Sequence, residues 1–271
     1  MPVYMPGRSQ LAVKVVSLFR ENPSRGLPYI QSVLVLLDGT NGSPVALMDG
    51  ACLTALRTGA ASGLATDLLA RKNSSTLMVF GAGGQSRLQI EGVCAVRSIR
   101  RTFVYDPNTE RAERLREELK GVVACEVIVA RSPAEVEHAD IVCTATTSQT
   151  SVFDDAHIRA GTHINAIGAY RPEMCEIPPA TVARALVVVD SRSSALLEAG
   201  DIIQAVAAGS FREESIHAEL GEIVAGSRAA RTTDAEVTLF KSVGNAVQDL
   251  VAAGRGLENA LRLGLGTTIE F

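Results

Sequence analysis

A glycine-rich segment at residues 76–86, T-L-M-V-F-G-A-G-G-Q-S, has the residue types of a phosphate-binding turn. An apolar run ends at Phe80, and Gly81, Gly83 and the small Ser86 follow before a helix-like pattern begins. Glycine permits the tight turn and the close approach of a pyrophosphate, and the third small residue lets the helix pack on the strand. The spacing predicts that a dinucleotide binds at the N-terminus of the helix. A glycine-rich turn without a ligand is the ordinary interpretation that competes with it.

An acidic residue, Asp106, follows the next apolar run at residues 102–105. From this position a carboxylate accepts a hydrogen bond from the ribose 2′-OH of NAD, whereas the 2′-phosphate of NADP would meet a like charge. We therefore expect NAD as the cofactor. NADP is the alternative, because Arg111 lies one helical turn further on and would soften the preference.

Further small and polar residues are candidates for lining the cofactor. Thr144-Ala145-Thr146 follows a later apolar run, where small hydroxyl residues can contact a ligand or can simply form a strand-end turn. Gly244 would allow either the close approach of a ring or the packing of a helix. The full set of candidate cofactor-binding residues is Thr58, Gly81, Gly83, Gly84, Gln85, Ser86, Asp106, Arg111, Thr144, Ala145, Thr146, Ser242 and Gly244.

Two basic residues stand in otherwise apolar surroundings. Lys14 lies in the middle of the run at residues 11–19, and Arg57 precedes a segment of small residues. An edge-strand lysine and a surface arginine are the ordinary interpretations. If both face one cleft, they form a clamp for a carboxylate, because arginine can donate two parallel hydrogen bonds and lysine adds a point charge.

Composition excludes several classes of protein. The chain has 271 residues, 46% hydrophobic and 21% charged, with a formal net charge of −4, which is typical of a globular protein with an ample core. The most basic run, R-S-I-R-R at residues 97–101, is short and is expected to be a solvated helix end, so we expect no nucleic-acid partner. Five cysteines without C-x-x-C spacing are expected to be reduced core residues, and the histidines give no metal signature. The absence of a signal peptide and of a long apolar span predicts no membrane partner and a cytoplasmic location.

The order of elements predicts an α/β fold. Strands are expected at residues 11–19, 29–37 and 44–48, the last two joined by a hairpin, and a small-residue helix at 54–70. From residue 76 strands and helices alternate, which predicts a doubly wound, Rossmann-type parallel sheet. The expected strands are 77–80, 102–105, 124–129, 141–144, 163–167 and 186–189, and the expected helices are 85–96, 110–119, 132–137, 178–185 and a tail from 234 to 263.

This order implies a discontinuous domain plan. Residues 71–235 are expected to form the dinucleotide-binding domain, and residues 1–70 with 236–271 a smaller α+β domain. A ligand is expected in a crevice at the carboxyl ends of the parallel strands.

Several segments together resemble the ornithine cyclodeaminase/mu-crystallin family. They are L-A-V-K-V-V-S-L-F-R-E-N-P (11–23), L-T-A-L-R-T-G-A-A-S (53–62), G-A-G-G-Q-S (81–86), I-N-A-I-G-A (164–169), V-D-S-R-S-S-A-L-L-E-A-G-D (189–201) and T-L-F-K-S-V-G-N-A-V-Q-D-L (238–250). They follow the family's order over nearly the whole chain. The resemblance implies a Rossmann-type domain, a substrate and dimerisation domain, a homodimer, and NAD(P)-linked chemistry at the Cα of a small amino or imino acid. It also implies that Lys14 and Arg57 hold the substrate's carboxylate as the catalytic pair.

Two departures from the family decide between activities. The chain begins where the family's first segment should already be under way, so an N-terminal part with substrate and dimer contacts is expected to be missing. The aspartate that cyclodeaminases carry after the strand of I-N-A-I-G-A is replaced by Tyr170, and a tyrosine is a poor base at neutral pH.

The sequence therefore favours a reductase of a cyclic imino acid, such as Δ1-pyrroline-2-carboxylate or Δ1-piperideine-2-carboxylate. Ornithine cyclodeaminase stays open as a second activity, because Glu173 or the missing segment would then supply the base. Two more functions stay open: an oxidoreductase like alanine dehydrogenase, and a non-catalytic binder of nucleotide or small molecules, like mu-crystallin.

Overall fold

The computed structural model describes residues 1–19 and 21–270, so Arg20 of the family-like segment 11–23 lies outside the described residues. These residues form two compact units. One consists of the described residues of the ranges Met1–Arg57 and Gly244–Phe271, and the other of Thr58–Val243. The long helix α1 (Gly50–Leu69) begins in the first unit and ends in the second.

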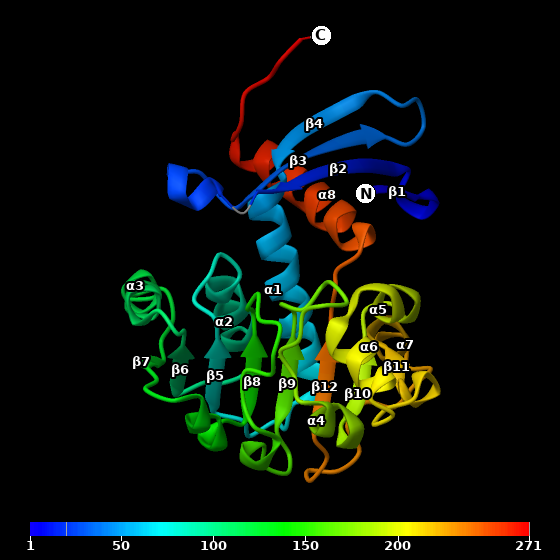
Figure 1. Ribbon diagram of the computed structural model, residues 1–271. Coiled ribbons are helices and arrows are strands. Elements are labelled where there is room, and N and C mark those ends of the chain that lie inside the picture. The colour runs from blue at the N-terminus through cyan, green and yellow to red at the C-terminus, as the bar shows by residue number, and fades with distance from the viewer. Residues whose placement is uncertain (20, 271) are drawn as a thin grey trace. The chain divides into compact units, whose positions relative to one another are not determined.

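The smaller unit is built on an antiparallel sheet. Within the described residues it has four strands in the order β1-β2-β3-β4: Pro2–Met5, Gln10–Leu18, Ile30–Asp38 and Pro44–Asp49. The short 3-10 helices η1 (Pro6–Arg8) and η2 (Asn22–Arg25) connect strands, and α8 (Ala246–Leu263) lies against one face of the sheet (Figure 1). Ala12, Leu34 and Leu36 of the sheet pack there against Leu250 and Ala253 of α8.

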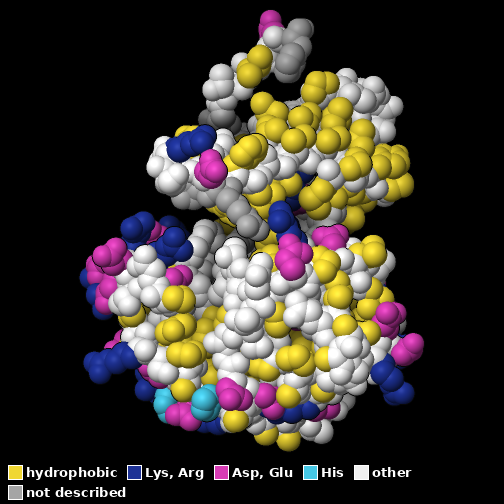
Figure 2. Space-filling view, in the orientation of Figure 1, with side chains coloured by type: hydrophobic (Ala, Val, Ile, Leu, Met, Phe, Trp, Pro, Cys, Tyr) yellow, Lys and Arg dark blue, Asp and Glu magenta, His cyan; other side chains and the backbone are white. Residues whose placement is uncertain are grey.

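The opposite face of this small sheet carries exposed apolar side chains. They come from all its strands: Tyr4, Val13, Val15, Val33, Val45 and Leu47. Figure 2 shows hydrophobic side chains gathered over β2–β4. Leu47 is 69% exposed and Val15 is 60% exposed, although both are strand residues of a kind that usually faces a core. We call these residues the open face.

The larger unit is a parallel sheet with helices on both sides (Figure 1). Within the described residues it has eight strands in the order β11-β10-β12-β9-β8-β5-β6-β7, all paired in parallel. Their bounds are Thr76–Phe80 (β5), Arg101–Tyr105 (β6), Glu126–Val129 (β7), Ile141–Thr144 (β8), His163–Ala166 (β9), Leu186–Val189 (β10), Ala218–Glu219 (β11) and Thr238–Lys241 (β12). The order reverses between β5 and β8, which is where ligands bind in such sheets.

The helices cover the two faces of this sheet in different groups. One face packs against α4 (Pro179–Arg184), α5 (Arg192–Glu198), α6 (Gly200–Ala207) and the 3-10 helix η3 (Pro133–His138). The 3-10 helix η4 (Asp155–His157) lies between Phe153 and Ile158, which pack on the same face. The other face packs against α2 (Ser86–Cys94), α3 (Thr109–Glu118), α7 (Leu220–Val224) and the second half of α1. A further 3-10 helix, η5, spans Glu213–Ser215. Coverage of both faces explains why the central strands are continuous apolar runs.

Glycines allow α1 and α2 to pack closely. A side chain at Gly59 would overlap the backbone of Leu88, and one at Gly92 would overlap the backbone of Gly59. The small residues of α1 therefore serve helix packing. Arg97 is a correction: it is buried rather than solvated, and its Nη2 donates to the carbonyls of Thr66, Asp67 and Ala70 at the end of α1.

The predicted order of strands and helices is confirmed from β2 to β10, and the fold class with it. The prediction of a continuous helical tail from residue 234 is wrong in its first part. Thr238–Lys241 forms β12 between β9 and β10, and α8 begins only at Ala246. Four consecutive buried residues show no alternation, so periodicity does not distinguish a buried strand from a helix.

The boundaries between the units lie at Arg57 and Gly244, whereas the sequence placed them at 70/71 and 235/236. The second half of α1 belongs to the larger unit because Ala65 and Leu69 pack on its sheet. The strand β12 belongs there because its neighbours are β9 and β10.

Three further expectations concern the cysteines, metal ligands and membrane-spanning helices. Cys143 and Cys175 are buried as predicted, but Cys52 is exposed on α1 and Cys94 and Cys125 are half-buried. Residues 1–19 and 21–270 contain no group of three or more His, Cys, Asp or Glu side chains that could hold a metal ion. Over the same residues, every helix is too short or too polar to cross a bilayer.

Candidate active site

The glycine turn lies between β5 and α2 at the carboxyl edge of the large sheet. Gly81 has φ +93°, a conformation that favours glycine, and its N–H donates to the Tyr105 carbonyl at 2.8 Å. The hydroxyl of Ser86, the first residue of α2, donates to the Gly81 carbonyl at 2.7 Å and accepts from the Gly83 N–H at 3.2 Å. The third small residue of the motif therefore closes the turn with its own side chain.

The middle of this turn is open. A Cβ atom on Gly83 or Gly84 would meet no described protein atom within 4 Å, whereas one on Gly81 would lie 2.7 Å from the Ala145 carbonyl oxygen. The Oε1 of Gln85 is buried without a hydrogen-bond partner among the described residues. Contacts with neighbouring protein atoms do not explain glycine at positions 83 and 84, where the turn is open. The turn therefore fits a pyrophosphate at the N-terminus of α2.

Asp106 fixes the other side of the turn. Its Oδ2 accepts from the Ala82 N–H at 2.9 Å and its Oδ1 accepts from the Asn108 N–H at 2.9 Å. The carboxylate is thus aligned at the end of β6, next to the glycine turn. This is the location from which it can accept from a ribose hydroxyl.

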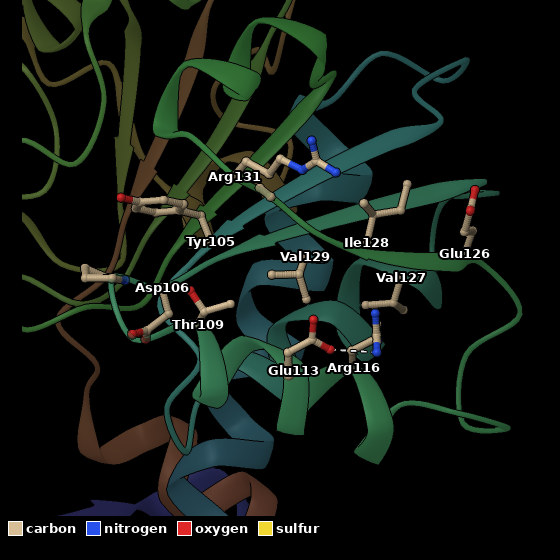
Figure 3. Close-up of a pocket in the computed structure, with 12 residues that line it drawn as sticks. Tyr105, Asp106, Thr109, Glu113, Arg116, Glu126, Val127, Ile128, Val129 and Arg131 are labelled. Carbon is tan, nitrogen blue, oxygen red and sulfur yellow. Dashed lines mark ion pairs between the residues drawn. The ribbon is translucent and has the colours of Figure 1, made fainter.

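A polar cavity of about 730 Å³ begins at Asp106 and continues along β7 (Figure 3). Its lining includes Thr109 and Glu113 of α3 and Arg131 beyond β7, and Glu113 is paired with Arg116 at 2.6 Å. Arg111 is exposed on α3 and does not line this cavity, because it is two residues from Thr109 and therefore points away from that face of the helix. The structure thus places Asp106, and not Arg111, at the cavity.

The predicted segment Thr144-Ala145-Thr146 forms a wall of the glycine turn. Its Ala145 carbonyl and the Thr146 methyl lie against Gly81. The Thr144 hydroxyl is completely buried and donates to Glu176 Oε2 at 2.9 Å, so it does not face a ligand space. The Thr146 N–H donates to the other oxygen, Oε1, of Glu176 at 2.6 Å.

In the smaller unit, the structure brings Lys14 and Arg57 together on one carboxylate, that of Asp249. Lys14 Nζ lies 2.7 Å from Asp249 Oδ2, and Arg57 Nε lies 3.1 Å from Asp249 Oδ1. Lys14 Nζ also donates to Thr54 Oγ1 at 3.1 Å, and Arg57 Nη1 donates to Gln248 Oε1 at 2.8 Å. The two predicted cations converge, and α8 supplies the groups that hold them.

In β2 the charged Lys14 is buried and its apolar neighbours are exposed, which is the opposite of the usual pattern in a strand with one solvent-facing side. Lys14 is 4% exposed and points with Ala12 toward α8, whereas Val13 and Val15 on either side point to the open face. Burial lowers the pKa of the Lys14 ammonium, and the hydrogen bond and charge of Asp249 oppose that shift. The formal charge of Lys14, Arg57 and Asp249 together is +1, which matches one carboxylate.

The remaining candidates have structural partners. Ser242 is buried after β12, and its hydroxyl donates to Asp190 Oδ2 at 2.8 Å. Gly244, with φ +81°, lies against the Arg57 guanidinium, so a side chain there would overlap that group. Thr58 is buried on α1. Gly244 therefore serves the approach of Arg57 rather than the start of α8, which Asn245 caps by accepting from the Gln248 N–H.

Sequence reasoning missed the acidic partners. Asp249 lies within the family-like segment 238–250, but it is far along the chain from Arg57 and Lys14, and only the packing of α8 on β2 joins them. Glu176 likewise follows β9 without a motif of its own. Helical spacing did offer one signal, because Asp249 shares the face of α8 that carries Leu250 and Ala253 into the core.

A family model and a related protein sequence both place this chain among known proteins. Residues 1–262 match the model of the ornithine cyclodeaminase/mu-crystallin family, so the predicted membership is confirmed. A Δ1-pyrroline-2-carboxylate reductase of Bacillus cereus is 40% identical over 273 residues, which cover 100% of this chain and 84% of that protein.

Two solved structures are also similar. The Δ1-pyrroline-2-carboxylate reductase of Thermococcus litoralis, in complex with NADH and L-proline, has a TM-score of 0.93 and 41% identity, covering 99% of this chain and 88% of that one. An archaeal alanine dehydrogenase dimer with bound NAD has a TM-score of 0.91 and 34% identity, covering 100% of this chain and 83% of that one.

Proposed function

Because the chain belongs to the ornithine cyclodeaminase/mu-crystallin family, we propose that it reduces a cyclic imino acid to the L-amino acid with NAD(P)H. The substrate is Δ1-pyrroline-2-carboxylate or its six-membered homologue, Δ1-piperideine-2-carboxylate. The observation that carries the proposal is identity of 40% over the whole chain with a reductase of the five-membered substrate. The clamp and the glycine turn are the local features that this activity requires.

The proposed roles follow the chemistry of each group. Lys14 and Arg57 bind the carboxylate of the imino acid by charge-assisted hydrogen bonds, and Asp249 keeps the two cations aligned. Bound NADH supplies the hydride that the ring C=N carbon accepts. The nitrogen gains a proton, for which the buried Lys14 ammonium is a donor because burial lowers its pKa.

The turn Gly81–Ser86 holds the pyrophosphate, and Asp106 accepts from the adenosine ribose. Both statements rest on the open space at Gly83 and Gly84 and on the position of Asp106 beside the polar cavity. NADH is the proposed cofactor because Asp106 would repel the additional phosphate of NADPH.

Tyr170 argues against cyclodeamination. It lies half-buried in the segment after β9, where the Arg171 guanidinium carbon is 5.7 Å from its ring centroid. A cyclodeaminase needs a base for the side-chain amine of ornithine, and a phenol is protonated at neutral pH. Glu173 is the competing candidate for that base.

The proposed partner is a second copy of this chain. The open face of the small sheet exposes a continuous set of apolar side chains, of the kind that marks a protein interface. A related alanine dehydrogenase is a dimer. We therefore assign the open face to a homodimer interface.

The test is an assay of the purified full-length chain with NADH and each cyclic imino acid, followed by loss of NADH absorbance. Parallel reactions contain L-ornithine with NAD, and pyruvate with ammonia and NADH. Oxidation of NADH that depends on the cyclic imino acid supports the proposal. Faster turnover of ornithine or pyruvate would replace it with cyclodeaminase or alanine dehydrogenase activity, and NADH binding without any turnover would leave a binding protein.

A further inference from the structure

The larger unit buries a linked group of three ionisable side chains that the proposed reaction does not use: Glu176, Asp201 and Lys241. Each is at most 1% exposed. Asp201 Oδ2 lies 2.8 Å from Lys241 Nζ, and the three residues come from the segment after β9, from α6 and from the end of β12. Charged groups are costly to bury unless they are paired and hydrogen-bonded, so their contacts indicate what they hold in place.

The Glu176 carboxylate ties together the ends of two neighbouring strands. Its Oε1 accepts from the Thr146 N–H after β8 at 2.6 Å, and its Oε2 accepts from the Gly168 N–H after β9 at 2.7 Å. Oε2 also accepts from the Thr144 hydroxyl at 2.9 Å and the Ala169 N–H at 3.1 Å. Both oxygens thus accept from backbone N–H groups, an arrangement that favours the ionised form.

Asp201 in turn fixes the backbone that carries Glu176. Its Oδ1 accepts from the N–H groups of Glu176 at 2.6 Å and Ile177 at 2.9 Å, while its Oδ2 is held by Lys241. The contacts therefore run from Lys241 to Asp201, to the backbone of Glu176, and through its carboxylate to the two loops.

These loops border the glycine turn. The Ala145 carbonyl and the Thr146 methyl are the atoms that a Cβ on Gly81 would meet, at 2.7 and 3.2 Å. Gly168 is packed so tightly that a side chain there would overlap Thr146 and Glu176. A shift of the loop at residues 144–146 is therefore transmitted to the turn by direct contact.

We propose that Glu176 is a positioning residue for the dinucleotide: its carboxylate sets the loops after β8 and β9 against the glycine turn, and the Asp201–Lys241 pair holds Glu176 in place. This inference rests on the proposed function in one respect, that the glycine turn binds NADH. The role belongs to Glu176 because it is the acceptor that both loops share.

The charge state of Glu176 gives this role a pH dependence. Burial raises the pKa of the Glu176 carboxyl, the charge of Lys241 on β12 opposes the shift, and that of Asp201 on α6 adds to it. Protonation removes an acceptor from the loops. NADH affinity is therefore expected to fall as the pH falls through the pKa of Glu176.

The experiment measures the Kd for NADH of the full chain, with the midpoint of thermal unfolding, in Glu176→Gln. The amide of glutamine has an NH2 group in place of one carboxylate oxygen, so one hydrogen-bond acceptor for the loops becomes a donor. We therefore expect the Kd for NADH to rise about tenfold or more and to lose its dependence on pH. Asp140→Asn is the matched control. Asp140 also accepts from two backbone N–H groups, those of Ser75 and Thr76, but at the amino end of β5. It should lower the unfolding midpoint and leave the Kd unchanged.

A second variant, the double substitution Asp201→Asn with Lys241→Met, retains Glu176 and removes the buried ion pair. Because Lys241 has the larger effect on Glu176, the pH at which NADH affinity falls should move upward. If Glu176→Gln does not fold, the pH dependence of NADH affinity in the double variant tests the role of Glu176 by itself. Normal NADH affinity in Glu176→Gln, or an unmoved pH dependence in the double variant, overturns the inference alone. A wild-type chain that binds no NADH overturns the proposed function and this inference with it.

Discussion

Replacement of Lys14 by methionine tests the proposed clamp most directly. Methionine fills similar space without the charge, and Asp249 keeps Arg57 as its partner at 3.1 Å. The remaining pair has no net charge, so it no longer matches a carboxylate ligand. We expect kcat/KM for the cyclic imino acid to fall while the Kd for NADH stays the same.

The size of the effect follows from the environment of Lys14. The ammonium is almost completely buried, so its hydrogen bond to a bound carboxylate is charge-assisted and shielded from water. Such a bond contributes about 1.5–3 kcal/mol, which corresponds to a loss of about 10- to 150-fold in kcat/KM. Stability should change much less than in Asp249→Asn, which leaves two buried cations without a counter-charge and should cost about 3–5 kcal/mol of unfolding free energy.

The assay is steady-state kinetics with the cyclic imino acid at several pH values, together with NADH titration. Lys72→Met is the control, because that lysine is exposed and makes the same kind of ion pair, with Asp67, at the surface. It should leave kcat/KM unchanged.

The pH profile adds a second readout. The clamp requires protonated Lys14, so kcat/KM should decrease as the pH rises through the Lys14 pKa. Burial places that pKa below the value of 10.5 for an ordinary lysine. The alkaline decrease should be absent from Lys14→Met. If kcat/KM and its alkaline limb are the same in wild type and Lys14→Met, the reasoning about the clamp is refuted.

Four further predictions concern other parts of the molecule. Wild type should bind NADH at least roughly tenfold more tightly than NADPH, and Asp106→Ser should reduce the ratio of the two dissociation constants, measured by paired titrations. Tighter binding of NADPH than of NADH by wild type would contradict the assignment of Asp106. With Tyr170 in place of the family's aspartate, L-ornithine and catalytic NAD should yield little ammonia or proline, and turnover comparable to imine reduction would restore the cyclodeaminase interpretation. Burial lowers the pKa of His163 from 6.5 to about 3, so between these pH values the unfolded chain binds a proton that the folded chain does not. The free energy of unfolding should therefore decrease as the pH is lowered, by about 2 kcal/mol at pH 5 relative to pH 8. Urea titration should show a much smaller decrease in His163→Gln. Leu47→Lys should lower the molar mass of the protein in solution from that of a dimer toward that of a monomer, as measured by size-exclusion chromatography with light scattering. Leu197→Lys, at a similarly exposed leucine of the larger unit, should leave the mass unchanged. Equal masses for both variants would exclude the open face as the interface.

The sequence was sufficient wherever the signal is local. The turn at Gly81–Ser86 requires particular residues within a few positions, and the alternation of apolar runs with helical patterns gave β5 to β10 in the right order. The segment at residues 238–241 was misread because four buried residues carry no periodicity. Its assignment as β12 depends on pairing with β9 and β10, which are distant in the chain.

The candidate site divides in the same way. Residue types alone singled out Lys14, Arg57 and Asp106, because a charge within an apolar run and an acid at a strand end are visible locally. The sequence left open which way Lys14 points, since apolar residues occupy both faces of β2, and only the packing of α8 on one face buries it.

Only the tertiary structure identified the acidic groups that hold the site. Asp249 meets Arg57 across most of the length of the chain, and Glu176 joins two loops through backbone N–H groups that no side-chain pattern reveals. Local sequence encodes turns, strands and helices because their hydrogen bonds and periodicities span a few residues. The partners of a buried charge are chosen by how those elements pack, and packing brings together residues whose separation in sequence carries no signal.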